Sequence, residues 1–311
     1  MTLLLTGALS LALDSETART PETIHIRIDG SVDPPTESVI RDGDVYSFTR
    51  NIFCSIELSR SDIIVDGVGY TLQGNGSRKG IDVTSVSGYI NVTIRNMKIR
   101  SFTVGIELAS SFEGRIYGNT ISNNKDGIRI TGFGQYSSFN NTISENTITN
   151  NENGIVMEGY VVGSLISGNI ITNNSKYGMT FITSMPLHSP VEENIISGNT
   201  VLGNGIGIGF SCSSNNIIYH NNFADNIVHV FTEGSVNVWD DGYPSGGNYW
   251  SSHVCNGNPN DGSQPFVLDK NNTDKYPFQV PNGWIFSVGL RIDGRANVYY
   301  VTTVRELNKC F

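Results

Sequence analysis

A four-residue pattern, in which glycine is followed by an apolar residue, any residue and a second apolar residue, recurs through the middle of the chain. A second pattern, apolar-x-x-Asn-x-apolar, recurs in phase with it. Repetition at a period of about 25 residues is typical of solenoids and other repeat architectures. The glycines of the first pattern are Gly80, Gly105, Gly127, Gly154, Gly178 and Gly205, and the asparagines of the second are Asn119, Asn146, Asn169, Asn199 and Asn221, with Asn96 in the corresponding slot upstream.

Each repeat predicts short strands, because apolar and polar residues alternate and Asn-Asn, Asn-Gly or Ser-Gly pairs interrupt them. Coils stacked at about 4.8 Å pair every backbone group and gather the aliphatic side chains into interior columns. We therefore expect an all-β fold, a right-handed single-stranded parallel β-helix, in which Ile106, Ile128 and Ile155 lie over one another. A leucine-rich repeat is the alternative, weakened by the absence of an L-x-x-L-x-L pattern and of helical segments.

The repeated asparagines predict a ladder at one corner of the coils. Asparagine tolerates left-handed backbone geometry, and its amide can bond the asparagines above and below it. The expected members are Asn96, Asn119, Asn146, Asn169, Asn199 and Asn221.

The pattern also divides the chain. Residues 1–21 are a candidate signal or leader remnant, because Met1–Leu13 resembles the apolar region of a secretory signal without its basic start; an apolar first strand or cap is the alternative. We expect an N-terminal cap in residues 22–50, the repeats in 51–232, an aromatic, Gly- and Asn-rich cap in 233–281, and a tail or hairpin in 282–311.

Charge and hydropathy narrow the function classes. The formal net charge is −9, which argues against sequence-independent nucleic-acid binding. No apolar run reaches 18 residues, so no complete membrane span is predicted. Together with the leader-like start, five N-x-S/T sequons favour a secreted or cell-surface glycoprotein, at Asn75, Asn91, Asn140, Asn173 and Asn271.

The four cysteines, Cys54, Cys212, Cys255 and Cys310, have no C-x-x-C spacing, which argues against a structural zinc site. Buried thiols and a disulfide are both open, and the most plausible bridge joins Cys212 to Cys255.

Several segments resemble the NosD-like group of parallel β-helix proteins, which includes exported archaeal proteins and overlaps carbohydrate-binding proteins and sugar hydrolases. The resemblance spans residues 22–281 and implies the fold more strongly than an activity. Its name also implies copper handling, for which His220, His229, Met179 and Met185 are the candidate ligands. The segments that carry it are Ile24–Pro35, Ile64–Gly74, the Asn repeats, Ser245–Ser251 and Asp274–Pro277.

Outward residues of the glycine pattern provide a candidate catalytic site. Asp82 and Glu107 project one coil apart, at about 5 Å, which is compatible with the two carboxylates of a retaining glycosidase. Arg129 extends the column and suits an anionic sugar. The alternative is a solvated face with a Glu107–Arg129 pair. Motifs of polygalacturonases and alginate epimerases are absent, so a polysaccharide lyase or hydrolase is the secondary hypothesis.

Aromatic residues near coil insertions favour carbohydrate binding, and the candidates are Tyr117, Phe133, Tyr136 and Tyr160, with Phe139 beside them. We expect Trp239 and Trp250 to cover the apolar end of the last coil. Asp269, Asn271 and Asp274 are candidate calcium ligands, with an Asx-turn-rich loop as the alternative. The sequence thus predicts a surface β-helix protein that binds a polysaccharide or surface glycan, or serves as a structural module.

Overall fold

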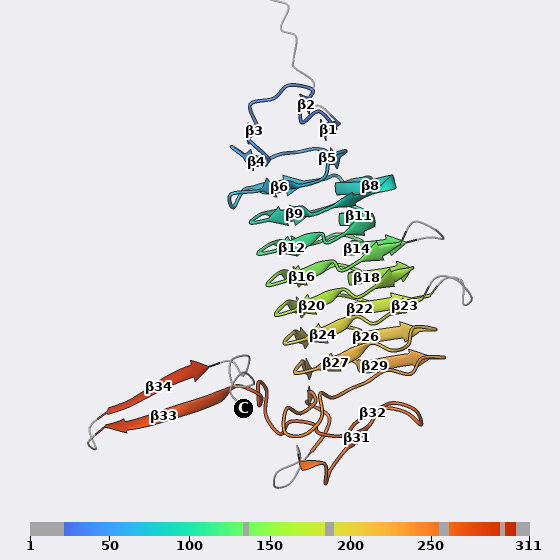
Figure 1. The fold of residues 1–311 in the computed structure, drawn as a ribbon, viewed down its shortest axis with the longest axis vertical. Coiled ribbons are helices and arrows are strands. Elements are labelled where there is room, and N and C mark those ends of the chain that lie inside the picture. Colours follow the sequence, from blue (N-terminus) through green and yellow to red (C-terminus); the bar gives the residue numbers. More distant parts are fainter. Residues whose placement is uncertain (1–21, 133–136, 184–189, 255–260, 293–295, 303–311) are drawn as a thin grey trace, which may run out of the picture.

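The computed structural model describes residues 22–132, 137–183, 190–254, 261–292 and 296–302, and every regular element in them is a β-strand. The strands wind into a stack of coils with three parallel sheets along its sides (Figure 1). The predicted parallel β-helix is therefore confirmed, and the leucine-rich repeat is wrong because the described residues contain no α-helix between the strands. None of them forms a helix long and apolar enough to cross a bilayer.

The first sheet carries the glycine pattern and is the longest. Its strands are β1 (Thr23–Ile26), β2 (Val32–Asp33), β5 (Ser55–Leu58), β8 (Lys79–Ile90), β11 (Val104–Phe112), β14 (Asp126–Gly132), β15 (Ser138–Phe139), β18 (Asn153–Gly159), β19 (Val161–Val162), β22 (Tyr177–Ile182), β23 (Val191–Glu192), β26 (Ile206–Ser211) and β29 (Val228–Glu233).

The second and third sheets consist mostly of three-residue strands. The second contains β3 (Val39–Asp42), β4 (Val45–Phe48), β6 (Ile63–Asp66), β9 (Val92–Arg95), β12 (Arg115–Tyr117), β16 (Thr142–Ser144), β20 (Leu165–Ser167), β24 (Ile195–Ser197) and β27 (Ile217–Tyr219). The third contains β7 (Thr71–Gln73), β10 (Lys98–Arg100), β13 (Thr120–Ser122), β17 (Thr147–Thr149), β21 (Ile170–Thr172), β25 (Thr200–Leu202), β28 (Asn222–Ala224) and β30 (Tyr249–Trp250).

Two antiparallel pairs follow the coils. They are β31 (Phe266–Val267) with β32 (Thr273–Asp274), and β33 (Phe286–Ile292) with β34 (Ala296–Thr302). At the other end, β1 pairs with β5 and β4 with β6 in parallel, so the parallel stacking already begins within residues 22–50.

The interior columns are stacked as predicted. Ile106 pairs with Ile128, and Ile128 with Ile155, and all three side chains are fully buried. Aromatic rings close the apolar interior at the C-terminal end of the solenoid. Trp239 and Trp250 are almost completely buried, and the Trp250 ring stacks on Phe223 at a centroid distance of 4.5 Å. The two tryptophans therefore cover the last coil, where an open end would leave apolar side chains in water.

The register corrects one copy of the glycine pattern. Met179 pairs with Ile208, so Gly178 lies over Gly207 and not over the expected Gly205. The sixth copy therefore reads Gly207-Ile208-Gly209-Phe210, and Thr180 lies over Gly209. Sequence spacing misplaced it because two glycine patterns overlap two residues apart in this segment.

The glycine column is a close backbone approach between coils. A Cβ atom on Gly154 would lie 2.4 Å from the carbonyl oxygen of Gly178 in the next coil. That oxygen belongs to β22, which is paired with β18 on one side and β26 on the other. It cannot move away from the new Cβ without disrupting this strand pairing.

We expect Gly154→Ala to lower the free energy of unfolding by about 2–3 kcal/mol through this overpacking, as measured by chemical denaturation. Gly209→Ala is the matched control, because its nearest neighbour is the edge of the half-buried Tyr177 ring, which can turn away. Equal losses in the two variants would contradict the close-approach explanation.

Candidate functional site

An asparagine ladder runs along the corner between the second and third sheets. In each rung after the first, the side-chain Oδ1 accepts hydrogen bonds from the backbone N–H and from Nδ2 of the asparagine one coil earlier, at 2.9–3.0 Å. Each side-chain Nδ2 also donates to a backbone carbonyl oxygen, so the ladder amides find their hydrogen-bond partners within the protein. The rungs are Asn119, Asn146, Asn169, Asn199, Asn221 and Asn248.

Asn96 is not in this ladder, which corrects one expected member. The slot is occupied by the buried Met97, whose backbone N–H donates to Asn119 Oδ1 at 3.2 Å. Asn96 is the exposed residue before it and has a positive φ of 55°. The expected left-handed geometry likewise belongs to the preceding position in later coils, for example Gly118 and Gly168, and not to the ladder asparagines.

Two further ladders escaped the sequence analysis. One contains Asn124, Asn151, Asn174, Asn204 and Asn226, which connect at the corner between the third and first sheets. The other ends in Asn194, Asn216, Asn237 and Asn272. The first was detectable, since each member follows a rung of the first ladder by five residues.

The first ladder ends on Asp274, which is fully buried. Its Oδ2 accepts hydrogen bonds from the Asn248 N–H at 2.7 Å and from Trp250 Nε1 at 2.8 Å. Burial raises the pKa of Asp274 to about 7, although these hydrogen bonds oppose the shift. In this structure the Asp274 carboxylate accepts hydrogen bonds within the cap, at the position where the sequence predicts a calcium ligand.

The other two candidate calcium ligands also take part in the cap. Asp269 accepts hydrogen bonds from the backbone N–H groups of Asn271 and Asn272 and from the Thr232 hydroxyl. Burial acts to raise the pKa of Asp269, but these hydrogen bonds outweigh burial and lower it. No group of three His, Cys, Asp or Glu side chains suited to a metal occurs in the described ranges. The geometry is that of an Asx turn.

The candidate catalytic residues lie on the outer face of the first sheet. Asp82 pairs directly with Glu107, and Glu107 with Arg129. Lys79 Nζ lies between the two carboxylates, 2.9 Å from Asp82 Oδ2 and 2.8 Å from Glu107 Oε2. Burial acts to lower the pKa of Lys79, but the hydrogen bonds to Glu107 and Asp82 outweigh burial and raise it.

Arg129 is next to Glu107 in the strand register but forms its ion pairs with other carboxylates. Its ion-pair partners are Asp126, which is buried, and Glu158 at 3.9 Å, so the alternative Glu107–Arg129 pair is not made. Lys79 therefore ties both candidate carboxylates into one ion-pair cluster on this face.

The candidate sugar-binding aromatics fall into two places. The rings of Phe112, Phe139 and Tyr160 follow one another along the solenoid, with centroids 5.6 and 5.5 Å apart; the first pair is tilted, the second is edge-to-face, and all three rings are half-exposed. Tyr117 is on the second sheet instead, where its hydroxyl accepts a hydrogen bond from Arg95 Nη1 at 2.9 Å. Phe133 and Tyr136 lie outside the described residues.

Comparison with protein families shows what kind of β-helix this is. The family model described as "Periplasmic copper-binding protein (NosD)" matches residues 26–258, which is more than half of the chain. The chain belongs to the NosD family. Comparison with curated proteins gave no match.

A solved structure similar to this NosD-family chain is that of the tailspike protein 2 enzymatically active domain of bacteriophage CBA120. The TM-score is 0.36 and the sequence identity 14%, over 61% of this chain and 33% of the tailspike chain. The chain thus spans about a third of the tailspike domain's length.

The copper ligands that the NosD name implies do not fit the described residues. The two candidate histidines bond within the protein: His220 Nε2 contacts the Ser245 carbonyl at 2.8 Å, and His229 Nε2 contacts Ser251 Oγ at 3.3 Å. Burial lowers the pKa of both histidines. Met179 is fully buried in the core, where packing explains it, and Met185 lies outside the described residues.

Surface modification sites are partly accessible. Among the sequons of this NosD-family protein, Asn75, Asn140, Asn173 and Asn271 are exposed and Asn91 is half-buried. Cys212 is an exposed free thiol, so the expected Cys212–Cys255 bridge is not formed in this structure; Cys255 lies outside the described residues.

Proposed function

We propose that this NosD-family chain is an extracytoplasmic β-helix protein that binds carbohydrate chains along its side, without cleaving them. The observation that carries the proposal is the row of neighbouring rings of Phe112, Phe139 and Tyr160, called the aromatic stack below because the coils that carry them are stacked. Three half-exposed rings from successive coils form a rigid apolar strip on a polar surface. Aromatic faces of this kind pack against the apolar faces of sugar rings, as they do against other flat partners.

A location outside the cytoplasm agrees with three features of the chain. These are the leader-like start of the sequence, the exposed sequons and the periplasmic description of the matching family. A cell-surface position gives the strip access to polysaccharide.

The test is retention of the purified chain in gels that contain neutral or acidic polysaccharides. We expect at least one polysaccharide to retard the protein, and Phe139→Ala or Tyr160→Ala to weaken the affinity about tenfold, as loss of a contact of about 1.4 kcal/mol does. Tyr117→Ala is the matched control, because this half-buried tyrosine lies on another sheet.

Two outcomes would overturn the proposal. One is the absence of retardation by every polysaccharide. The other is release of reducing sugar or unsaturated product that Glu107→Gln abolishes, which would establish the lyase or hydrolase hypothesis instead.

A further inference from the structure

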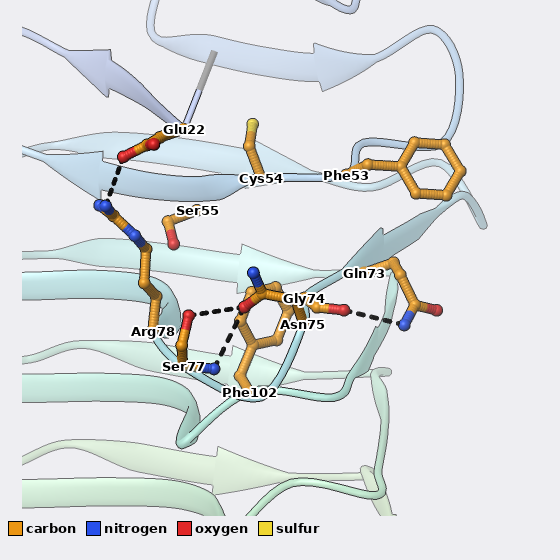
Figure 2. Close-up of a pocket in the computed structure, with 10 residues that line it drawn as sticks. All are labelled: Glu22, Phe53, Cys54, Ser55, Gln73, Gly74, Asn75, Ser77, Arg78 and Phe102. Carbon is orange, nitrogen blue, oxygen red and sulfur yellow. Dashed lines mark hydrogen bonds and ion pairs between the residues drawn. The ribbon is translucent and has the colours of Figure 1, made fainter. Parts of the chain in front are cut away.

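A cavity of about 500 Å³ lies at the N-terminal end of the solenoid, away from the aromatic stack (Figure 2). It arises from unequal corners between the third and first sheets. Residues 53–55 join the paired positions Ile52 and Ile56, whereas residues 73–80 join Leu72 and Ile81 in the next coil. The first connection is short and stays close to the core, whereas the second is longer and extends outward. The two coils therefore diverge at this corner and leave a space between them.

The asparagine ladder of this corner also stops short of the cavity. Its first member, Asn124, accepts the backbone N–H of Phe102 at 3.0 Å, and in the coil of Phe102 the aromatic ring takes the place of an amide. A Cβ on Gly74 would lie 2.4 Å from that ring, so Gly74 lets the ring form part of the wall. Asn75 lies at this corner and lines the cavity, but its Oδ1 accepts hydrogen bonds from Ser77 and it does not extend the ladder.

Ser55 is a buried polar residue at the wall of the cavity. Its side chain lines the cavity and is only 8% exposed, yet Ser55 Oγ has no hydrogen-bond partner among the described residues. An unsatisfied buried hydroxyl costs about 1–3 kcal/mol. A ligand that brings a hydroxyl or carbonyl into the cavity removes that cost.

The rest of the lining indicates a neutral ligand. Glu22 and Arg78 carry opposite charges and form an ion pair with each other at the wall. Burial raises the pKa of the Cys54 thiol to about 11, so it stays protonated at neutral pH and is a poor ligand for copper. Phe53 is 66% exposed and offers an aromatic face, and Gln73 adds an amide.

We propose that this cavity binds one neutral sugar residue, with Phe53 packing on an apolar face of the sugar ring and Ser55 bonding one of its hydroxyls. The volume falls within the range of small-molecule sites, roughly 300–1,000 Å³. The choice of a sugar as ligand rests on the proposed function, and the site is separate from the aromatic stack.

The experiment is calorimetric titration of the purified full chain with the methyl glycosides of glucose, galactose, mannose and N-acetylglucosamine. We expect at least one glycoside to bind, and Phe53→Ala and Ser55→Ala each to weaken that binding about tenfold. Ser55→Ala is also expected to leave the Tm of the free protein unchanged or raised, because it removes an unpartnered hydroxyl. Tyr243→Ala, an aromatic of similar exposure in the C-terminal cap, is the matched control.

The cavity as a sugar site and the aromatic stack as a polysaccharide site can be refuted independently. Phe53→Ala should keep retention by polysaccharide, and Tyr160→Ala should keep glycoside binding. If no glycoside binds, or if the Phe53 and Ser55 variants bind as the unaltered protein does, the cavity is not a sugar site, whatever the polysaccharide gels show.

Discussion

Replacement of Asn169 by aspartate is expected to lower the free energy of unfolding by about 3–5 kcal/mol. Asn169 lies in the middle of the first ladder and is 1% exposed. Its Nδ2 donates to the Ile143 carbonyl and to Asn199 Oδ1, both at 2.9 Å. Aspartate has the same shape, but it places a carboxylate oxygen against these acceptors, and burying an unpaired charge is costly.

The measurement is chemical denaturation of Asn169→Asp beside Asn150→Asp. Asn150 is exposed and outside the ladder, so its variant should change stability by no more than about 0.5 kcal/mol. The loss in Asn169→Asp should shrink in acid, because a protonated carboxyl regains a donor. Similar losses in the two variants at neutral pH would refute the ladder as the source of the effect.

The stability of the unaltered protein is expected to fall as the pH rises from about 4 to about 7. Burial raises the pKa of Asp274 to about 7 in the folded protein, from an ordinary value of 3.8. Below the ordinary value both states hold the proton, so the contribution of Asp274 is fully present. As the pH rises, the unfolded chain releases the proton first, and stability is lost until the folded pKa is passed. A shift of this size corresponds to about 4 kcal/mol.

Denaturation at a series of pH values tests this expectation. Asp274→Asn should flatten the slope between pH 4 and 7, because asparagine does not titrate and can still accept the N–H groups of Asn248 and Trp250. Asp261→Asn is the control, since Asp261 is exposed and should leave the slope in place. A slope that survives in Asp274→Asn would assign the titration to another group.

The architecture was predictable because it follows from local repetition. Ile106, Ile128 and Ile155 recur with glycine and asparagine at nearly fixed spacing, and stacking is the one arrangement that buries all three. The ladder positions from Asn119 onward follow for the same reason. The tryptophan cap was also predictable, since large aromatics after the last repeat have an apolar end to cover.

The sequence predictions that differ from the structure fall where the repeat length varies between coils or where the chain leaves the solenoid to form the cap. Gly205 and Asn96 fit the letter pattern, but a shift of one or two residues moves a side chain to another place on the coil. Asp274 resembles a calcium ligand in sequence, yet the cap folds back so that it ends a ladder that begins far upstream. Long-range contacts of this kind have no local signal.

The sequence by itself determined the repeating coil, its apolar interior and its asparagine corner, because these depend on residue type at a regular interval. Only the tertiary structure decided that Lys79 pairs with both Asp82 and Glu107, that Phe112 joins Phe139 and Tyr160 in one row, and that a cavity opens beside Ser55. The physical reason is that these features depend on differences between neighbouring coils, in corner length and side-chain direction. The repeat pattern in the sequence does not record these differences, and they become visible only when neighbouring coils are compared in the folded structure.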